Sequence, residues 1–237
     1  MIVHVLSLIV ITFVYAMLVL LVIRFSDVEK MEAFKTLLLA FVFGFAAAIV
    51  AASIESLIAF LGVAVTSIFM VIIVAPIAEE YAKLYMSTSR YFIEEMDEPE
   101  DALIYAACVA LGFAFIENVL YIVTFSLELS YVQLVDLTIQ RMFLCIPIHI
   151  AATSIGITVY IYLREIYDYN HIEALVLAVA SAAPLHAAYN LMAITGSLTM
   201  ASIIVILSIV AITFAWLMLR SMKPTYKLPL PHHKNLY

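Results

Sequence analysis

Residues 34–54 have the sequence FKTLLLAFVFGFAAAIVAASI, a run of 21 residues in which Lys35 is the only charged side chain. About 20 predominantly apolar residues suffice for a helix to cross the hydrocarbon core of a bilayer. A water-soluble helix would carry polar residues along one face, and this run has no such face. The stretch therefore predicts a membrane-spanning helix over residues 34–54.

The rest of the chain has the same character. Of its 237 residues, 66% are hydrophobic and 12% are charged, and the mean hydropathy is +1.13. This composition excludes soluble, disordered and disulfide-stapled proteins. The formal net charge of −7 and the scattered basic residues do not suggest nucleic acid as a partner. We expect one all-α transmembrane domain over residues 1–222 and a short cytoplasmic tail over residues 223–237.

Six further spans are predicted, over residues 1–23, 66–92, 101–125, 140–163, 172–195 and 198–219. The first lacks the basic start and cleavage site of a signal peptide, so we expect it to be retained. The third lies in a longer apolar stretch, 57–92, and its window is ambiguous. An external N-terminus and a cytoplasmic C-terminus place nearly all Lys and Arg residues on the cytoplasmic side. The polytopic bundle is therefore expected to have about seven spans.

Small residues recur at every fourth position in three of these spans, which lets helix backbones approach closely in lipid. The three stripes are Ala40, Gly44, Ala48 and Ala52; Ala102, Ala106, Ala110 and Ala114; and Ala174, Ala178 and Ala182. Continued by the same step, two of the stripes reach Asn118, His186 and Asn190. These polar residues are therefore expected to face neighbouring helices and not lipid.

Several polar side chains lie inside the predicted spans, where an ionisable group is costly and usually marks a functional site. They are Glu79, Glu80, Lys83, Glu117, Asn118, His149, His186 and Asn190. Glu117, His149 and His186 each lie roughly ten residues from the external end of a span, and a third span over residues 66–92 places Glu79 near the same depth. We expect four helices to bring these groups to one hydrated chamber.

Prolines precede three of the polar residues by two or three positions. Pro76 comes before Glu79, Pro147 before His149, and Pro184 before His186. Proline bends a helix and frees the carbonyl four residues earlier, which here belongs to Ile72, Phe143 and Ala180. The pattern predicts bent helices around a wet pocket, although ordinary kinks would give the same sequence.

The third span contains two adjacent glutamates that point in different directions. Glu79 and Lys83 lie on one helix face, whereas Glu80 is turned by about 100°, so only one glutamate can point squarely into a pocket. Lys83 and one glutamate could instead form a structural ion pair. The surplus carboxylate must be compensated by protonation, a metal or a histidine. Arg141, at the external margin, is interpreted as an interfacial anchor.

With these residues in place, the chain resembles the PrsW family of intramembrane proteases, related to the type II CAAX prenyl endopeptidases. Residues 79–83 resemble the motif EExxK, 113–118 the motif FxxxEN, and 186–190 the motif HxxxN; the segment from Arg141 to His149 completes the match. The prenyl endopeptidases have a histidine at the position of Glu117. The resemblance implies cleavage of a membrane-associated protein in a prokaryotic cell membrane by glutamate-activated water.

In the mechanism expected from these residues, Glu79 or Glu80 deprotonates water with the help of His149. His186 and Asn190 would donate hydrogen bonds to the oxyanion. Lys83 would set the charge of the glutamates, Glu117 would orient a partner or bind a metal, and Asn118 and Arg141 would support the site.

Two alternatives stay open. Zinc is a possible cofactor, held by Glu80, Glu117, His149 and His186, although the chain has no HExxH pair on one helix face. A proton- or cation-coupled transporter would also place carboxylates and histidines within the membrane, but no internal repeat or pair of broken helices is visible. The sequence does not indicate the oligomeric state.

Overall fold

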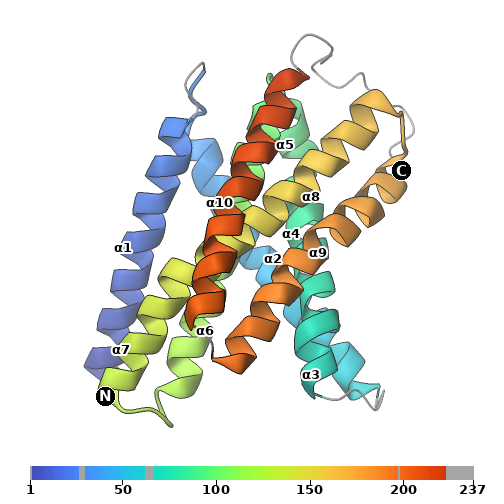
Figure 1. Cartoon of the computed structure of the whole chain (residues 1–237). Coiled ribbons are helices and arrows are strands. Elements are labelled where there is room, and N and C mark those ends of the chain that lie inside the picture. Colours follow the sequence, from blue (N-terminus) through green and yellow to red (C-terminus); the bar gives the residue numbers. More distant parts are fainter. Residues whose placement is uncertain (1, 27–29, 62–66, 197, 223–237) are drawn as a thin grey trace.

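The protein is a bundle of long helices in the computed structural model (Figure 1). The structure describes residues 2–26, 30–61, 67–196 and 198–222, and it contains no strand within these ranges. The predicted tail over residues 223–237 lies outside the described residues. The helices are α1 (Ile2–Ser26), α2 (Phe34–Phe60), α3 (Ser67–Phe69), η1 (Met70–Val74), α4 (Ala75–Ser87), α5 (Arg90–Glu95), α6 (Pro99–Phe125), α7 (Tyr131–Gln140), η2 (Arg141–Cys145), α8 (Ile146–Ile166), α9 (His171–Thr195) and α10 (Leu198–Ser221).

Six helical segments in the described part of the chain are long and apolar enough to cross a membrane, so the chain is an integral, multi-pass membrane protein. Helices α7, η2 and α8 form one of these segments, Tyr131–Ile166. The six do not include the continuous helix formed by α3, η1 and α4, because it carries Glu79, Glu80 and Lys83. Helix α1 begins and α10 ends at opposite ends of the bundle (Figure 1). The seventh span and the orientation in the membrane stay predictions.

Helix α6 lies at the centre of the bundle, and its small residues let α2 approach it closely. A Cβ atom at Gly112 would overlap the backbone of Phe41 in α2, and one at Gly44 would overlap the backbone of Val109 in α6. Close backbone approach through small residues is the usual way in which helices associate in lipid. The interface between α2 and α6 therefore depends on Gly44 and Gly112, each of which faces the backbone of the other helix.

The predicted stripes on α6 and α9 are fully buried, as expected for packing faces. The stripe on α2 was predicted incorrectly at its last position. Ala48 is half-buried and packs against the cluster of Ala47, Ala51, Ala82 and Phe113, whereas Ala52 is exposed. Ala52 borders a cavity, described below.

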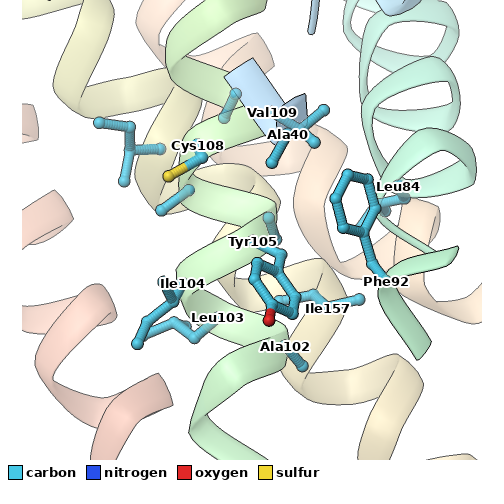
Figure 2. Packing of buried hydrophobic residues seen from close by; sticks show 14 of the residues in the cluster. Ala40, Leu84, Phe92, Ala102, Leu103, Ile104, Tyr105, Cys108, Val109 and Ile157 are labelled. Carbon is cyan, nitrogen blue, oxygen red and sulfur yellow. The ribbon is translucent and has the colours of Figure 1, made fainter. Parts of the chain in front are cut away.

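The start of α6 is well defined. Pro99 occupies the first turn, and the side chain of Asp101 accepts hydrogen bonds from the backbone N–H groups of Asp97 (2.8 Å) and Glu98 (2.7 Å). Carboxylates satisfy the free N–H groups at a helix N-terminus, which confirms the predicted helix start to within two residues. One turn into the core, Tyr105 packs against Phe92 of α5, with ring centroids 5.3 Å apart (Figure 2).

Two of the three prolines follow a π-helical turn. The N–H of Ala75 donates to the carbonyl of Met70, and the N–H of Ile146 to that of Arg141, each five residues back. These turns lie directly before Pro76 and Pro147, where an α-helical hydrogen bond is lost. The expected distortion is therefore confirmed at both sites. Pro184, in contrast, lies inside the uninterrupted helix α9.

Replacing Gly112 with Ala should force α2 and α6 apart, because the new methyl group meets the backbone of Phe41, which cannot rotate away. We expect a loss of about 1–3 kcal/mol in the free energy of unfolding. The measurement is denaturant titration in detergent, followed by circular dichroism. Gly156→Ala is the comparison and should lose less, since its methyl group meets chiefly the end of the Leu84 side chain, with the backbone oxygen of Ala178 farther away at 3.2 Å. Equal losses in the two variants would contradict this account.

Candidate active site

The predicted polar residues from four separate helices lie together inside the bundle. Helix α4 contributes Glu79, Glu80 and Lys83; α6 contributes Glu117 and Asn118; α8 contributes His149; and α9 contributes His186. All of them are buried except Glu117, which is partly exposed. Arg141 of η2 joins the same cluster. The convergence predicted from depth along each span is thus observed in the described structure.

Glu80 is the most fully bonded carboxylate of the cluster. Its side chain is completely buried and lies 2.5 Å from Lys83 Nζ. His186 Nδ1–H donates to the same oxygen (2.9 Å), and the hydroxyl of Thr153 donates to the other (2.9 Å). Three donors stabilise the charged carboxylate in its buried position. Glu80 therefore fixes its neighbours and has no free oxygen to offer to a substrate.

His149 is held on both sides of its ring. Lys83 Nζ lies 2.9 Å from Nδ1, and Glu117 Oε2 lies 2.8 Å from Nε2. An ammonium group has only hydrogen atoms to give, so Nδ1 accepts from Lys83 and Nε2–H donates to Glu117. The two contacts thus select one neutral tautomer of His149.

The interpretation of Arg141 as an interfacial anchor was wrong. Its side chain is buried, and Nη2 lies 2.9 Å from Glu117 Oε1. Its Nε donates to Asn118 Oδ1 (2.8 Å), and the guanidinium lies 3.6 Å from the centre of the Tyr121 ring. The side chain turns inward because the adjacent α6 residues provide a carboxylate, an amide and an aromatic face, which together replace its hydration.

Asn190 has a partner that its sequence motif does not reveal. Its Nδ2 donates to the carbonyl of Val71 in η1, at 2.9 Å. In the π-helical register this carbonyl would need the N–H of residue 76, but Pro76 has none. The expected free carbonyl at Ile72 is therefore shifted by one residue to Val71. Asn190 compensates for the missing hydrogen bond and links α9 to η1.

Glu79 differs from its neighbour Glu80. It is 8% exposed, and its Oε2 is buried without a hydrogen bond to any residue that the structure describes. This oxygen lies 3.7 Å from His186 Nε2 and 3.9 Å from His149 Nδ1. A buried polar atom without a partner is unfavourable and is often found at functional sites. Glu79 is thus positioned to interact with a molecule that enters the site.

A cavity of about 740 Å³ borders Glu79. Its walls come from α2, α4, α6, α7, α8, α9 and the π-helical segments, and they include Glu79, Glu117, His149 and Asn190, but neither Glu80 nor His186. The expectation that only one of the adjacent glutamates points into a pocket is therefore met by Glu79. Ala48, Ala51 and Ala52 form a smooth wall on α2.

Sequence reasoning missed three participants. Thr153 lies one helical turn after His149, and this spacing was the available signal for its role. Cys145 borders the cavity and lies 3.3 Å from Arg141 Nη2, but a lone cysteine in an apolar run gives no signal. Glu55, which follows the predicted span over residues 34–54 directly, also borders the cavity.

The cluster was also tested as a metal site. Donor atoms of Glu79, His149 and His186 lie within 4.8 Å of one another, which differs from the set predicted for zinc. However, Nδ1 of His149 accepts from the Lys83 ammonium at 2.9 Å. A divalent cation would compete with this positive charge for the same lone pair. These three residues therefore do not fit a metal unless Lys83 is displaced. A second group of potential ligands, Glu117, Cys145 and His149, is engaged by a cation in the same way, because Arg141 Nη2 lies 2.9 Å from Glu117 Oε1 and 3.3 Å from Cys145 Sγ.

Comparisons with known proteins agree with this geometry. The sequence model of a family described as PrsW family intramembrane metalloprotease matches residues 32–217, which include every residue of the cluster. A stretch of 58 residues is 40% identical to Protease PrsW of Geobacillus kaustophilus (strain HTA426), covering 23% of this chain and 24% of that relative. The matched stretch is thus about a quarter of the relative's length. No solved structure matches the chain.

Removing Lys83 should show how strongly the cluster depends on its ion pair. We expect Lys83→Met to lower the free energy of unfolding by about 3–5 kcal/mol, because Glu80 is left charged and buried. The double variant Lys83→Met/Glu80→Gln should lose less than the sum of the single variants in denaturant titration. Arg90→Met, which breaks an exposed pair with Glu94, is the control and should lose less than about 1 kcal/mol. Additive losses at Lys83 and Glu80 would refute the coupling.

Proposed function

Because the chain belongs to the PrsW family of intramembrane metalloproteases, we propose that it is an endopeptidase that hydrolyses a peptide bond of a membrane protein within the bilayer. The observation that carries the proposal is Glu79, which lines the cavity and holds a buried Oε2 without a hydrogen bond next to two histidines. Water can reach a cavity of this kind, and a carboxylate there can act as a base. The substrate would be a membrane protein of a prokaryotic cell, in keeping with the Geobacillus relative.

In the proposed reaction, Glu79 Oε2 takes a proton from a water molecule, and the water oxygen attacks the carbonyl carbon of the scissile bond. The tetrahedral intermediate collapses as its C–N bond breaks. The proton held by Glu79 passes to the leaving nitrogen, so the products are a carboxyl group and an amine. General base catalysis of this kind contributes about 10²–10⁴-fold to the rate.

The neighbouring residues position this base. Glu80 holds His186 and Lys83, and Glu117 holds His149, so both imidazoles next to Glu79 have fixed orientations. Asn190 keeps a second amide hydrogen besides the one given to Val71 and borders the cavity, which supports it as a donor to the oxyanion. His186 could provide a second donor from Nε2 when its ring is protonated.

The family description implies a metal, whereas the position of Lys83 next to His149 favours a base that acts without one. The ammonium next to His149 already supplies positive charge in the cluster. We therefore derive no step through a metal and assign water activation to Glu79. The relation to the type II CAAX prenyl endopeptidases stays a prediction.

Separate replacement of Glu79 and Glu80 tests whether the two glutamates have different roles. Glu79→Gln should lower the cleavage rate about a hundredfold or more, with little change in the free energy of unfolding, because its Oε2 has no hydrogen bond to lose. Glu80→Gln should lower both, because three donors lose a charged acceptor.

Cleavage would be followed with a single-span membrane substrate in liposomes, and unfolding by denaturant titration. Glu128→Gln, an exposed residue between α6 and α7, is the control for loss of one negative charge. Full activity of Glu79→Gln would eliminate Glu79 as the base.

Chelation tests the argument from Lys83. Purified protein dialysed against a zinc chelator should retain its cleavage rate, and elemental analysis should find well below one zinc per chain. The opposite result, activity lost on chelation and restored by Zn²⁺, would mean that Lys83 leaves His149 and that Glu79, His149 and His186 bind the metal.

A further inference from the structure

Glu55 of α2 is a carboxylate without an assigned role. It is half-buried and borders the cavity. In the part of the chain that the structure describes, its side chain makes neither a hydrogen bond nor an ion pair. Helix α2 is long and apolar enough to span the membrane, and Glu55 lies five residues before its end at Phe60. A charged group in such a helix is expensive unless water or a cation reaches it.

Glu55 lies at about the level of Glu79. Ala51 of α2 packs in one cluster with Ala82 of α4, and the two helices run in opposite directions (Figure 1). Glu55 follows Ala51 by four residues, about 6 Å, and Glu79 precedes Ala82 by three residues, about 4.5 Å. Both displacements point toward the same end of the bundle. The two carboxylates therefore border the cavity at similar depth on adjacent helices.

The cavity wall carries more negative than positive charge. Its carboxylates are Glu55, Glu79 and Glu117, and its basic side chain is Arg141. Arg141 is engaged by Glu117 at 2.9 Å, so it does not neutralise the other two. Glu79, in addition, has a buried oxygen without a hydrogen bond. A cationic group that entered the cavity would therefore be attracted to its α2 side.

We propose that Glu55 determines substrate specificity by pairing with a Lys or Arg side chain of the bound peptide, within about two residues of the scissile bond. This inference rests on the proposed function. A peptide side chain fits better than a free metal ion, because Glu55 belongs to none of the groups of potential metal ligands in the described residues. The smooth wall of Ala48, Ala51 and Ala52 leaves room for an extended chain beside Glu55.

The test uses full-length protein in liposomes. Its substrates are single-span peptides with Lys, Met or Glu at one position next to the mapped cleavage site. For wild type, kcat/KM should be about tenfold or more higher for the Lys peptide than for the Met peptide, mainly through KM. Glu55→Gln should remove this preference, and Glu55→Lys should favour the Glu peptide. Glu128→Gln is the matched control and should keep the wild-type preference.

Binding separates failure of this inference from failure of the proposed function. Affinities for fluorescent Lys and Met peptides are measured with Glu79→Gln and with Glu79→Gln/Glu55→Gln, neither of which requires turnover. The first should prefer the Lys peptide about tenfold, and the second should not. Cleavage or binding without a charge preference, or a preference that survives Glu55→Gln, would overturn the role of Glu55. Preferential binding without cleavage by wild type would leave Glu55 a cation-binding residue and refute the protease.

Discussion

The buried ammonium of Lys83 organises the cluster. It lies between Glu80 and His149, in a place where an unpaired charge would cost several kcal/mol. Because an ammonium can only donate, it keeps Glu80 charged and selects the neutral tautomer of His149. Glu80 then accepts from His186, which leaves the second nitrogen of that ring directed toward Glu79. One lysine thus fixes both imidazoles and makes two adjacent glutamates chemically different.

The two π-helical turns connect this electrostatic arrangement to the backbone. Each ends directly before a proline, and each adds a residue to its turn, which rotates the following helix relative to a regular α-helix. Helices α4 and α8 carry Glu79, Glu80 and His149 just after these turns. The rotation of α4 and α8 after these turns therefore determines which of their side chains border the cavity. The bond from Asn190 to the carbonyl of Val71 satisfies the backbone group that the distortion exposes.

Much of this arrangement could be predicted from the sequence. The bilayer sets the length that a spanning helix needs, and it makes charged residues within the helix costly. The convergence of four helices followed from counting residues along each span, and the shared depth of Glu117 and His149 is observed as a contact of 2.8 Å. Rotations and partners could not be predicted. A single π turn moved the free carbonyl from Ile72 to Val71, and the inward turn of Arg141 depends on neighbours supplied by another helix. Such pairings depend on the tertiary structure and leave no periodic pattern in the sequence.

The carboxylate of Glu117 has a counter-charge close to it. Its charge is matched by Arg141, just as that of Glu80 is matched by Lys83. Each basic residue of the described cluster is thereby engaged with one carboxylate, and Glu79 is left with two imidazoles at 3.7 and 3.9 Å instead of a cation. Glu117 thus lies next to its own counter-charge, and through His149 it also fixes one of the two imidazoles beside Glu79.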